Sequence, residues 1–162
     1  MTSASSNLIF GHFIIIKLKT NKLKNLGLSD TSEEVKNVES KDTTDEKAFE
    51  ILKGAYTKAV EAQVADFNKK ADEEITAIKK VENLGDDVAT YTGKVDAAKK
   101  AVKDALSAFT KGLIVTTKHF DESTGEYVTR DNYVEQRKAF DAALAKQTPV
   151  LTSALAEAKA QA

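Results

Sequence analysis

Residues 88–109 read VATYTGKVDAAKKAVKDALSAF, and this stretch decides the fold class. Its apolar side chains recur in alternating steps of three and four: Val88, Tyr91, Val95, Ala98, Val102, Ala105 and Phe109. This spacing predicts one face of an α-helix, and three heptads of it are typical of a coiled-coil seam. An ordinary helix of a bundle shows the same pattern, so both interpretations stay open. The coiled-coil interpretation predicts an oligomer interface formed by Val88, Tyr91, Val95, Val102 and Phe109.

Helical patterns continue on both sides of this stretch. Upstream, Thr43 and Glu46 form a capping box, and Gly85 can end a helix in the left-handed conformation. Downstream, Pro149 predicts a kink or a fresh helix start with Thr148 as its cap. We therefore expect helices over about 43–84, 86–111 and 130–161, within a helical region over 43–162.

The period changes between the second and third predicted helices. Residues 113–117 are largely β-branched, 122–125 have turn chemistry, and 127–129 are β-like again. This order predicts a small hairpin over about 113–129, with Gly125 in the left-handed position of its turn.

The N-terminal 28 residues form a zone of different composition. They carry lysines but no acidic residue, and apolar and basic side chains alternate over 16–19. Alternation predicts an extended, β-like arm, which needs a partner surface to become ordered. We expect residues 1–28 to be a docking arm that binds through Phe13, Ile14, Ile15, Ile16 and Leu18. Residues 29–42 are predicted to be a polar linker with a short helix.

The composition argues against most catalytic and binding chemistry. The 162 residues have a net charge of -1, no Cys and only two His, so thiol nucleophiles and cysteine zinc sites are excluded. Carboxylates are interspersed with lysines, a pattern typical of solvated helix faces. We therefore expect no enzymatic activity, no cofactor and no metal site. The near-zero charge favours neither nucleic acid nor a membrane as a partner, and no apolar run reaches the roughly 20 residues of a membrane span.

One short element resembles a known family. Residues 24–30, KNLGLSD, followed by residues 35–38, VKNV, resemble an element of bacteriophage virion fibre proteins of the head-fibre and tail-fibre type. The matching residues include Asn25, Leu26, Gly27, Leu28, Ser29 and Asp30, and then Asn37 and Val38. In that family the element introduces or punctuates a trimeric shaft, and helical coiled-coil stretches follow it. This chain departs from most shaft versions at Ser29, where they carry glycine.

The resemblance implies a structural protein located in the virion. Its partners would be further copies of itself, with a trimer compatible, and other capsid or tail proteins. Together with the patterns above, we expect a mainly α, elongated fold with a β-like N-terminal arm and a small hairpin. The expected function is a non-enzymatic fibre or capsid/tail accessory subunit. The alternative is a monomeric helical-bundle protein-binding module, located in the cytoplasm.

Overall fold

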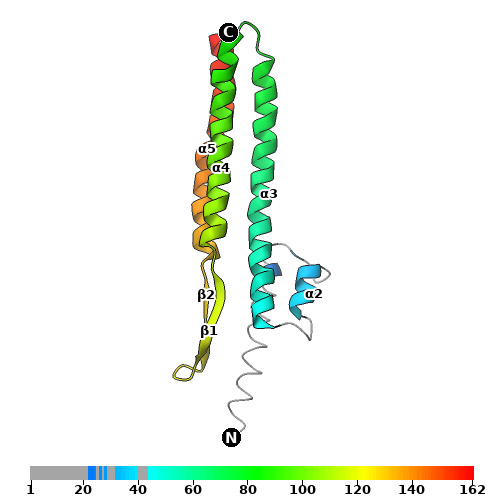
Figure 1. Cartoon of the computed structure of the whole chain (residues 1–162), viewed down its shortest axis with the longest axis vertical. Helices are drawn as coiled ribbons and strands as arrows, with labels where there is room; N and C mark the ends of the chain where they lie inside the picture. The colour runs from blue at the N-terminus through cyan, green and yellow to red at the C-terminus, as the bar shows by residue number, and fades with distance from the viewer. Residues whose placement is uncertain (1–21, 25, 27, 29–31, 40–43) are drawn as a thin grey trace. The chain divides into compact units, whose positions relative to one another are not determined.

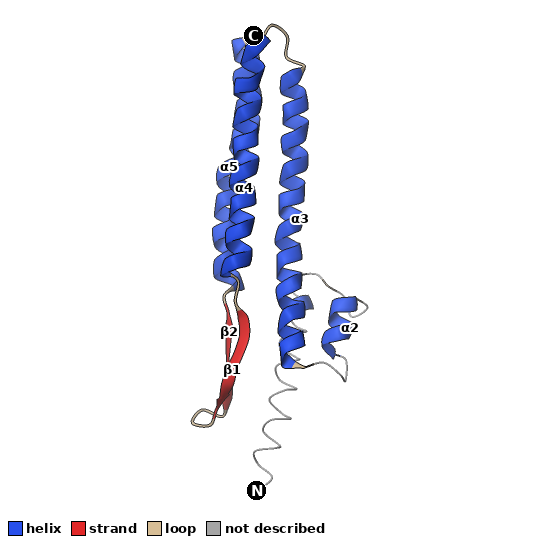
Figure 2. Ribbon diagram, in the orientation of Figure 1, coloured by secondary structure: helices blue, strands red, loops and turns tan. Residues whose placement is uncertain are grey.

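The computed structural model describes residues 22–24, 26, 28, 32–39 and 44–162. Figure 1 shows their elements, which are mostly helices (Figure 2). In chain order these are α2 (Glu33–Glu39), α3 (Asp45–Lys79), the 3-10 turn η1 (Gly85–Asp87), α4 (Val88–Gly112), β1 (Val115–Asp121), β2 (Glu126–Asp131) and α5 (Tyr133–Gln161). The predicted mainly α fold class is confirmed. No helix in this part of the chain is both long and apolar enough to cross a membrane.

The predicted arm lies mostly outside the described residues. This holds for all five of its expected docking residues: Phe13, Ile14, Ile15, Ile16 and Leu18. Where the structure does describe the predicted arm, residues 22–24 are helical rather than extended. The backbone N–H of Leu26 bonds to the carbonyls of Lys22 and Leu23 at 3.2 and 3.1 Å, and that of Leu28 bonds to Leu23 at 3.2 Å. These bonds, together with the complete burial of Leu23, favour a compact turn over a strand.

The chain divides into two compact units, and the division falls within α3, between Ala59 and Val60. Unit 1 comprises the chain up to Ala59 together with Leu113–Tyr133, and unit 2 comprises Val60–Gly112 and Val134–Ala162. The apolar core of unit 1 contains Leu23, Val35, Val38, Ala48, Phe49, Leu52, Ala55, Tyr56 and Leu113. Unit 1 therefore buries side chains from the N-terminal segment, from α2 and from the first turns of α3.

The ends of α3 differ from the predicted ones. Thr44 precedes the first helical residue, and its Oγ1 accepts the backbone N–H of Lys47 at 3.2 Å, which is a helix cap. Thr43 of the predicted capping box lies outside the described residues. At the other end α3 stops at Lys79, because Asn83 and Gly85 adopt left-handed φ angles of 66° and 55° in the connection to α4. Gly54 does not interrupt the helix.

Unit 2 is built from three helical segments. Its buried side chains come from the second part of α3, from the loop before η1, and from α4 and α5: Val60, Val64, Phe67, Ala71, Ile78, Leu84, Val95, Ala98, Val102, Phe109, Phe140, Leu151, Ala154 and Ala158. The rings of Phe109 and Phe140 meet edge to face, with centroids 6.5 Å apart. Ion pairs join the helix surfaces: Lys99 Nζ lies 2.7 Å from Asp72, and Lys94 Nζ lies 2.5 Å from Glu157.

Helix α5 runs without interruption through Pro149 to Gln161. The predicted fresh start with Thr148 as a cap is therefore wrong. The Thr148 hydroxyl instead donates a hydrogen bond to the carbonyl of Leu144, 2.9 Å away, one turn earlier in the same helix. Tertiary packing of Leu151 and Ala154 just beyond the proline accounts for the continued helix, since packing can override local propensity.

Two antiparallel strands, β1 and β2, lie between α4 and α5. Their register runs from Val115 opposite Asp131 to Asp121 opposite Glu126, with an irregularity between Thr117 and His119. Gly125 has a φ of 72° in the connecting turn. Sequence analysis placed a hairpin over about 113–129; the second strand reaches Asp131, and α5 begins at Tyr133 instead of about 130.

Candidate functional site

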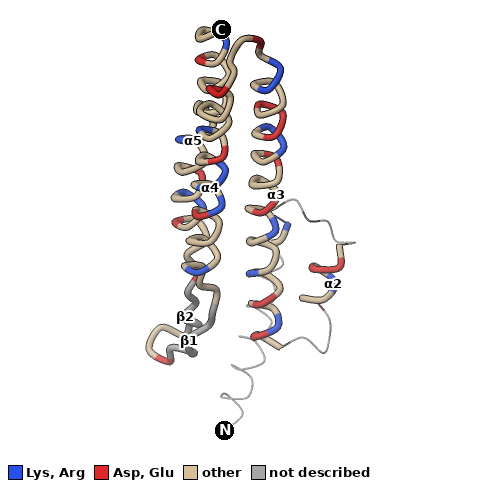
Figure 3. The backbone as a smooth tube through the Cα atoms, turned by 45° about the horizontal axis from the view of Figure 1, so that its top comes forward, with Lys and Arg blue, Asp and Glu red and all other residues tan. Residues whose placement is uncertain are grey.

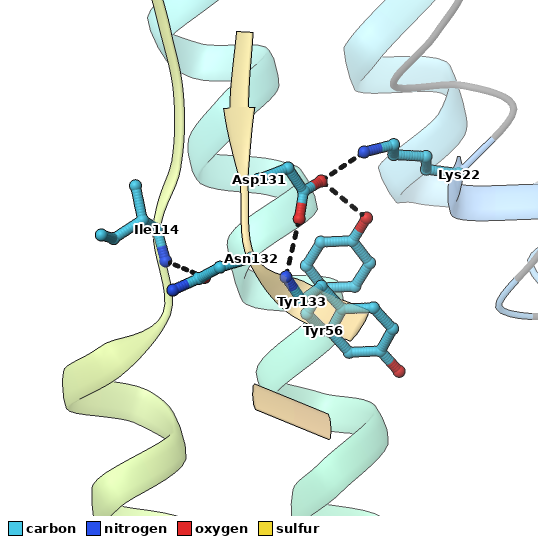
Figure 4. A network of polar contacts seen from close by, with 6 residues as sticks. All are labelled: Lys22, Tyr56, Ile114, Asp131, Asn132 and Tyr133. Atoms are coloured by element: carbon cyan, nitrogen blue, oxygen red, sulfur yellow. Dashed lines mark hydrogen bonds and ion pairs between the residues drawn. The ribbon is translucent and has the colours of Figure 1, made fainter. Parts of the chain in front are cut away.

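Asp131, the last residue of β2, is the centre of a polar cluster in unit 1 (Figure 4). Its side chain is 10% exposed. One carboxylate oxygen, Oδ2, accepts hydrogen bonds from the ammonium of Lys22 and, at 3.2 Å, from the hydroxyl of Tyr56. The other oxygen, Oδ1, accepts the backbone N–H of Tyr133 at 2.9 Å. Asp131 therefore ties together the N-terminal segment, α3 and the start of α5.

An aromatic pair and a backbone clamp flank this carboxylate. The rings of Tyr56 and Tyr133 stack with an angle of 7° between their planes and a distance of 3.8 Å between their centroids. Next to them, Asn132 Oδ1 accepts the N–H of Ile114 at 2.7 Å, and the Asn132 N–H donates to the Ile114 carbonyl at 3.2 Å. This reciprocal pair closes the base of the hairpin and fixes the backbone that carries Asp131.

The protonation states of the cluster follow from burial and charge. Burial alone would raise the pKa of Asp131, but the hydrogen bonds from Lys22, from the Tyr133 N–H and from Tyr56, together with the Lys22 charge, outweigh it and hold that pKa below its usual value. Burial, followed by the negative charge of Asp131, raises the pKa of Tyr56 well above its usual value. At neutral pH the carboxylate of Asp131 is therefore ionised and the phenol of Tyr56 is neutral.

This arrangement is suited to holding segments together. Both oxygens of Asp131 are engaged by donors of the chain itself, and the Tyr56 hydroxyl is engaged by Asp131. A carboxylate saturated in this way is a poor general base, because its lone pairs already accept hydrogen bonds. Within the described ranges, no group of three or more His, Cys, Asp or Glu side chains gathers as a metal site would require.

Three of the five residues predicted to form the oligomer interface are buried within the single chain. Val95, Val102 and Phe109 are at most 1% exposed within the single chain. The chain's own apolar side chains cover them, so in this conformation they offer no surface to a second chain. Only Val88 and Tyr91, near the start of α4, remain partly exposed, and the ammonium of Lys94 lies 5.6 Å from the centre of the Tyr91 ring. An apolar stripe alone does not specify whose surface covers it.

Each unit carries a hollow on its surface. In unit 1, a groove of about 250 Å³ between α2 and α3 is lined by Glu33, Glu34, Asn37, Ile51, Gly54, Ala55 and Lys58. In unit 2, an open hollow of about 710 Å³ follows α3 along Ala65, Asn68, Lys69, Asp72, Glu73 and Thr76. Charges of both signs alternate along the long helices (Figure 3), as predicted for solvated faces.

Sequence reasoning missed the Asp131 cluster. Lys22 and Asp131 are 109 residues apart, and Tyr56 lies 75 residues before Asp131. The one local signal is an Asp-Asn pair directly before a helix, which is typical of side-chain capping of the following backbone.

Comparisons with protein-family models, with curated proteins and with solved structures found no match.

Proposed function

We propose that the chain is a non-enzymatic structural protein of a virion, a fibre or a capsid/tail accessory subunit. The observation that carries this proposal is the KNLGLSD and VKNV element, which resembles the element that introduces helical segments in phage fibre proteins. In this chain VKNV lies in α2, and its two valines, Val35 and Val38, are completely buried in unit 1. The VKNV part of the element thus contributes two buried side chains to unit 1, and the long helix α3 follows it in the chain.

In this proposal the arm and the helices have separate roles. The arm, residues 1–28, attaches the protein to a neighbouring subunit of the particle. The helices form the displayed part, and their principal seam pairs within the chain, as the burial of Val95, Val102 and Phe109 supports. Self-association then depends on the arm and on the partly exposed start of α4 at Val88 and Tyr91.

A second candidate function is the monomeric helical-bundle protein-binding module. The same burial of the α4 stripe favours it, because a chain that covers its own seam has no need of a second copy to become stable. The two functions differ in oligomeric state, which makes that quantity the decisive one.

Light scattering after size exclusion, over a wide range of protein concentrations, separates the two functions. The virion proposal predicts a particle whose mass is a multiple of 17.6 kDa. It also predicts that Ile15→Asp with Leu18→Asp in the arm returns the protein to a monomer. The matched control, Ser5→Asp with Ser6→Asp, adds the same charge to the arm and should leave the oligomer intact. A 17.6 kDa monomer at all concentrations would favour the binding module.

A further inference from the structure

A short N-terminal strap lies on unit 1 and is held by two anchors of different kinds. The strap consists of the described residues Lys22, Leu23, Lys24, Leu26 and Leu28. Three helical residues cannot sustain a helix by themselves, so this turn depends on tertiary contacts. One anchor is apolar, because Leu23 is completely buried, and the other is ionic, because Lys22 pairs with Asp131.

The two anchors respond differently to charge. The buried side chain of Leu23 carries no charge, so its contact with unit 1 involves no titrating group. The contact between Lys22 and Asp131 requires both charges, and the Lys22 side chain, 38% exposed, can return to water when the pair breaks. The carboxylate is less free to leave, since Tyr56 and the Tyr133 backbone also hold it. The strap is therefore the mobile partner, and Asp131 is the fixed one.

We propose that the pair of Lys22 and Asp131 is a charge-operated latch that holds the strap on unit 1, and that breaking this pair loosens the strap. This inference rests on the proposed function, in which the arm attaches to a neighbouring subunit.

The groups that face Asp131 determine how the latch responds to acid. Among the described residues these are Lys22 from the strap, Tyr56 from α3, and Tyr133 from α5 through its backbone N–H. Acid therefore acts on the latch by protonating the carboxylate of Asp131. Because its pKa lies below the usual value of about 4, the latch stays closed down to that pH and opens only in stronger acid.

Limited trypsin digestion of the full chain tests the latch at neutral pH. Cleavage after Lys24 is the readout, because Lys24 is exposed and belongs to the strap. Asp131→Asn keeps an oxygen that can accept the Tyr133 N–H but removes the charge, and Lys22→Met keeps the apolar stem but removes the amine. Each is expected to raise the rate of cleavage after Lys24 about tenfold, and the double variant no further than either alone.

Asp141→Asn is the matched control. It makes the same chemical change at the exposed pair of Asp141 with Arg137 on α5, and it should leave cleavage after Lys24 unchanged. Wild-type rates in both folded latch variants would overturn the proposal, as would an equal increase in the control. These outcomes do not depend on oligomeric state, so the failure of the latch and the failure of the virion proposal are distinguishable.

A measurement on the unmodified protein covers the case in which the variants fold poorly. The amide signals of Leu26 and Leu28, whose N–H groups bond within the strap, are followed by NMR as the pH is lowered. The latch predicts a loss of their protection with a midpoint below about pH 4. A midpoint at or above that value, or protection that persists until the whole protein unfolds, would overturn it.

Discussion

Phe109→Ala is expected to lower the free energy of unfolding by about 3–5 kcal/mol. The ring is 1% exposed and meets Phe140 edge to face. Burial of roughly 150 Å² of aromatic surface at about 25 cal/mol per Å² gives about 4 kcal/mol. The edge-to-face contact with Phe140 accounts for about 0.5–1.5 kcal/mol of the expected loss of about 3–5 kcal/mol.

Urea unfolding followed by far-UV circular dichroism measures this loss. Phe109→Leu is the matched control, because it retains most of the volume and should cost less than about 1.5 kcal/mol. The unfolding midpoint should not change with protein concentration, since the structure covers Phe109 with side chains of the same chain. A loss below about 1 kcal/mol, or a midpoint that rises with concentration, would show that Phe109 does not pack within its own chain.

Three further predictions concern stability. The pKa of Asp131 is lowered in the folded protein, so the stability that its carboxylate contributes should be complete above the unfolded pKa of about 4 and lost as the pH falls through the folded pKa. Urea unfolding at several pH values should show this loss of stability, and Asp131→Asn should remove the pH dependence. Pro149→Ala should raise the free energy of unfolding by up to about 3 kcal/mol by restoring an N–H for the Ala145 carbonyl, and an unchanged melting temperature would contradict this. Gly54→Ala should stabilise the protein by about 1 kcal/mol, because the added Cβ meets open space in a helix. Gly85→Ala should destabilise it by about 1–2 kcal/mol, because Gly85 has a φ of 55°. Melting temperatures that change in the same direction in both variants would refute the reasoning.

Local patterns predicted the helices well because helix formation depends on neighbours three and four residues away. The stripe from Val88 to Phe109 placed α4 correctly to within about two residues. The ends were harder to predict, since α3 stops at Lys79 instead of about residue 84, and two residues of the connection to α4, Asn83 and Gly85, take left-handed φ angles. Pro149 left a kink or a fresh start open, and packing beyond it sustains α5, which lies within the single helix predicted over 130–161.

The candidate site could not be predicted in the same way. Periodicity reports which side chains share a face, but it carries no information about a partner 109 residues away, such as Asp131 for Lys22. The same limit applies to the residues predicted to form an oligomer interface on α4, because periodicity does not identify the surface that covers them. The sequence shows that Val95 and Val102 need an apolar cover, and it does not specify whether a second chain or the same chain supplies it.

The location of the protein in purified virus particles tests the central claim most directly. Antibody raised against the full chain would be used for gold labelling of particles from the source culture. The amount of the protein in the part of the lysate that does not purify with the particles, the unbound fraction, would be measured in parallel. The virion proposal predicts label at a defined position on the capsid or the tail, and the protein in the particle fraction after density purification. Protein found only in the unbound fraction, with unlabelled particles, would contradict it.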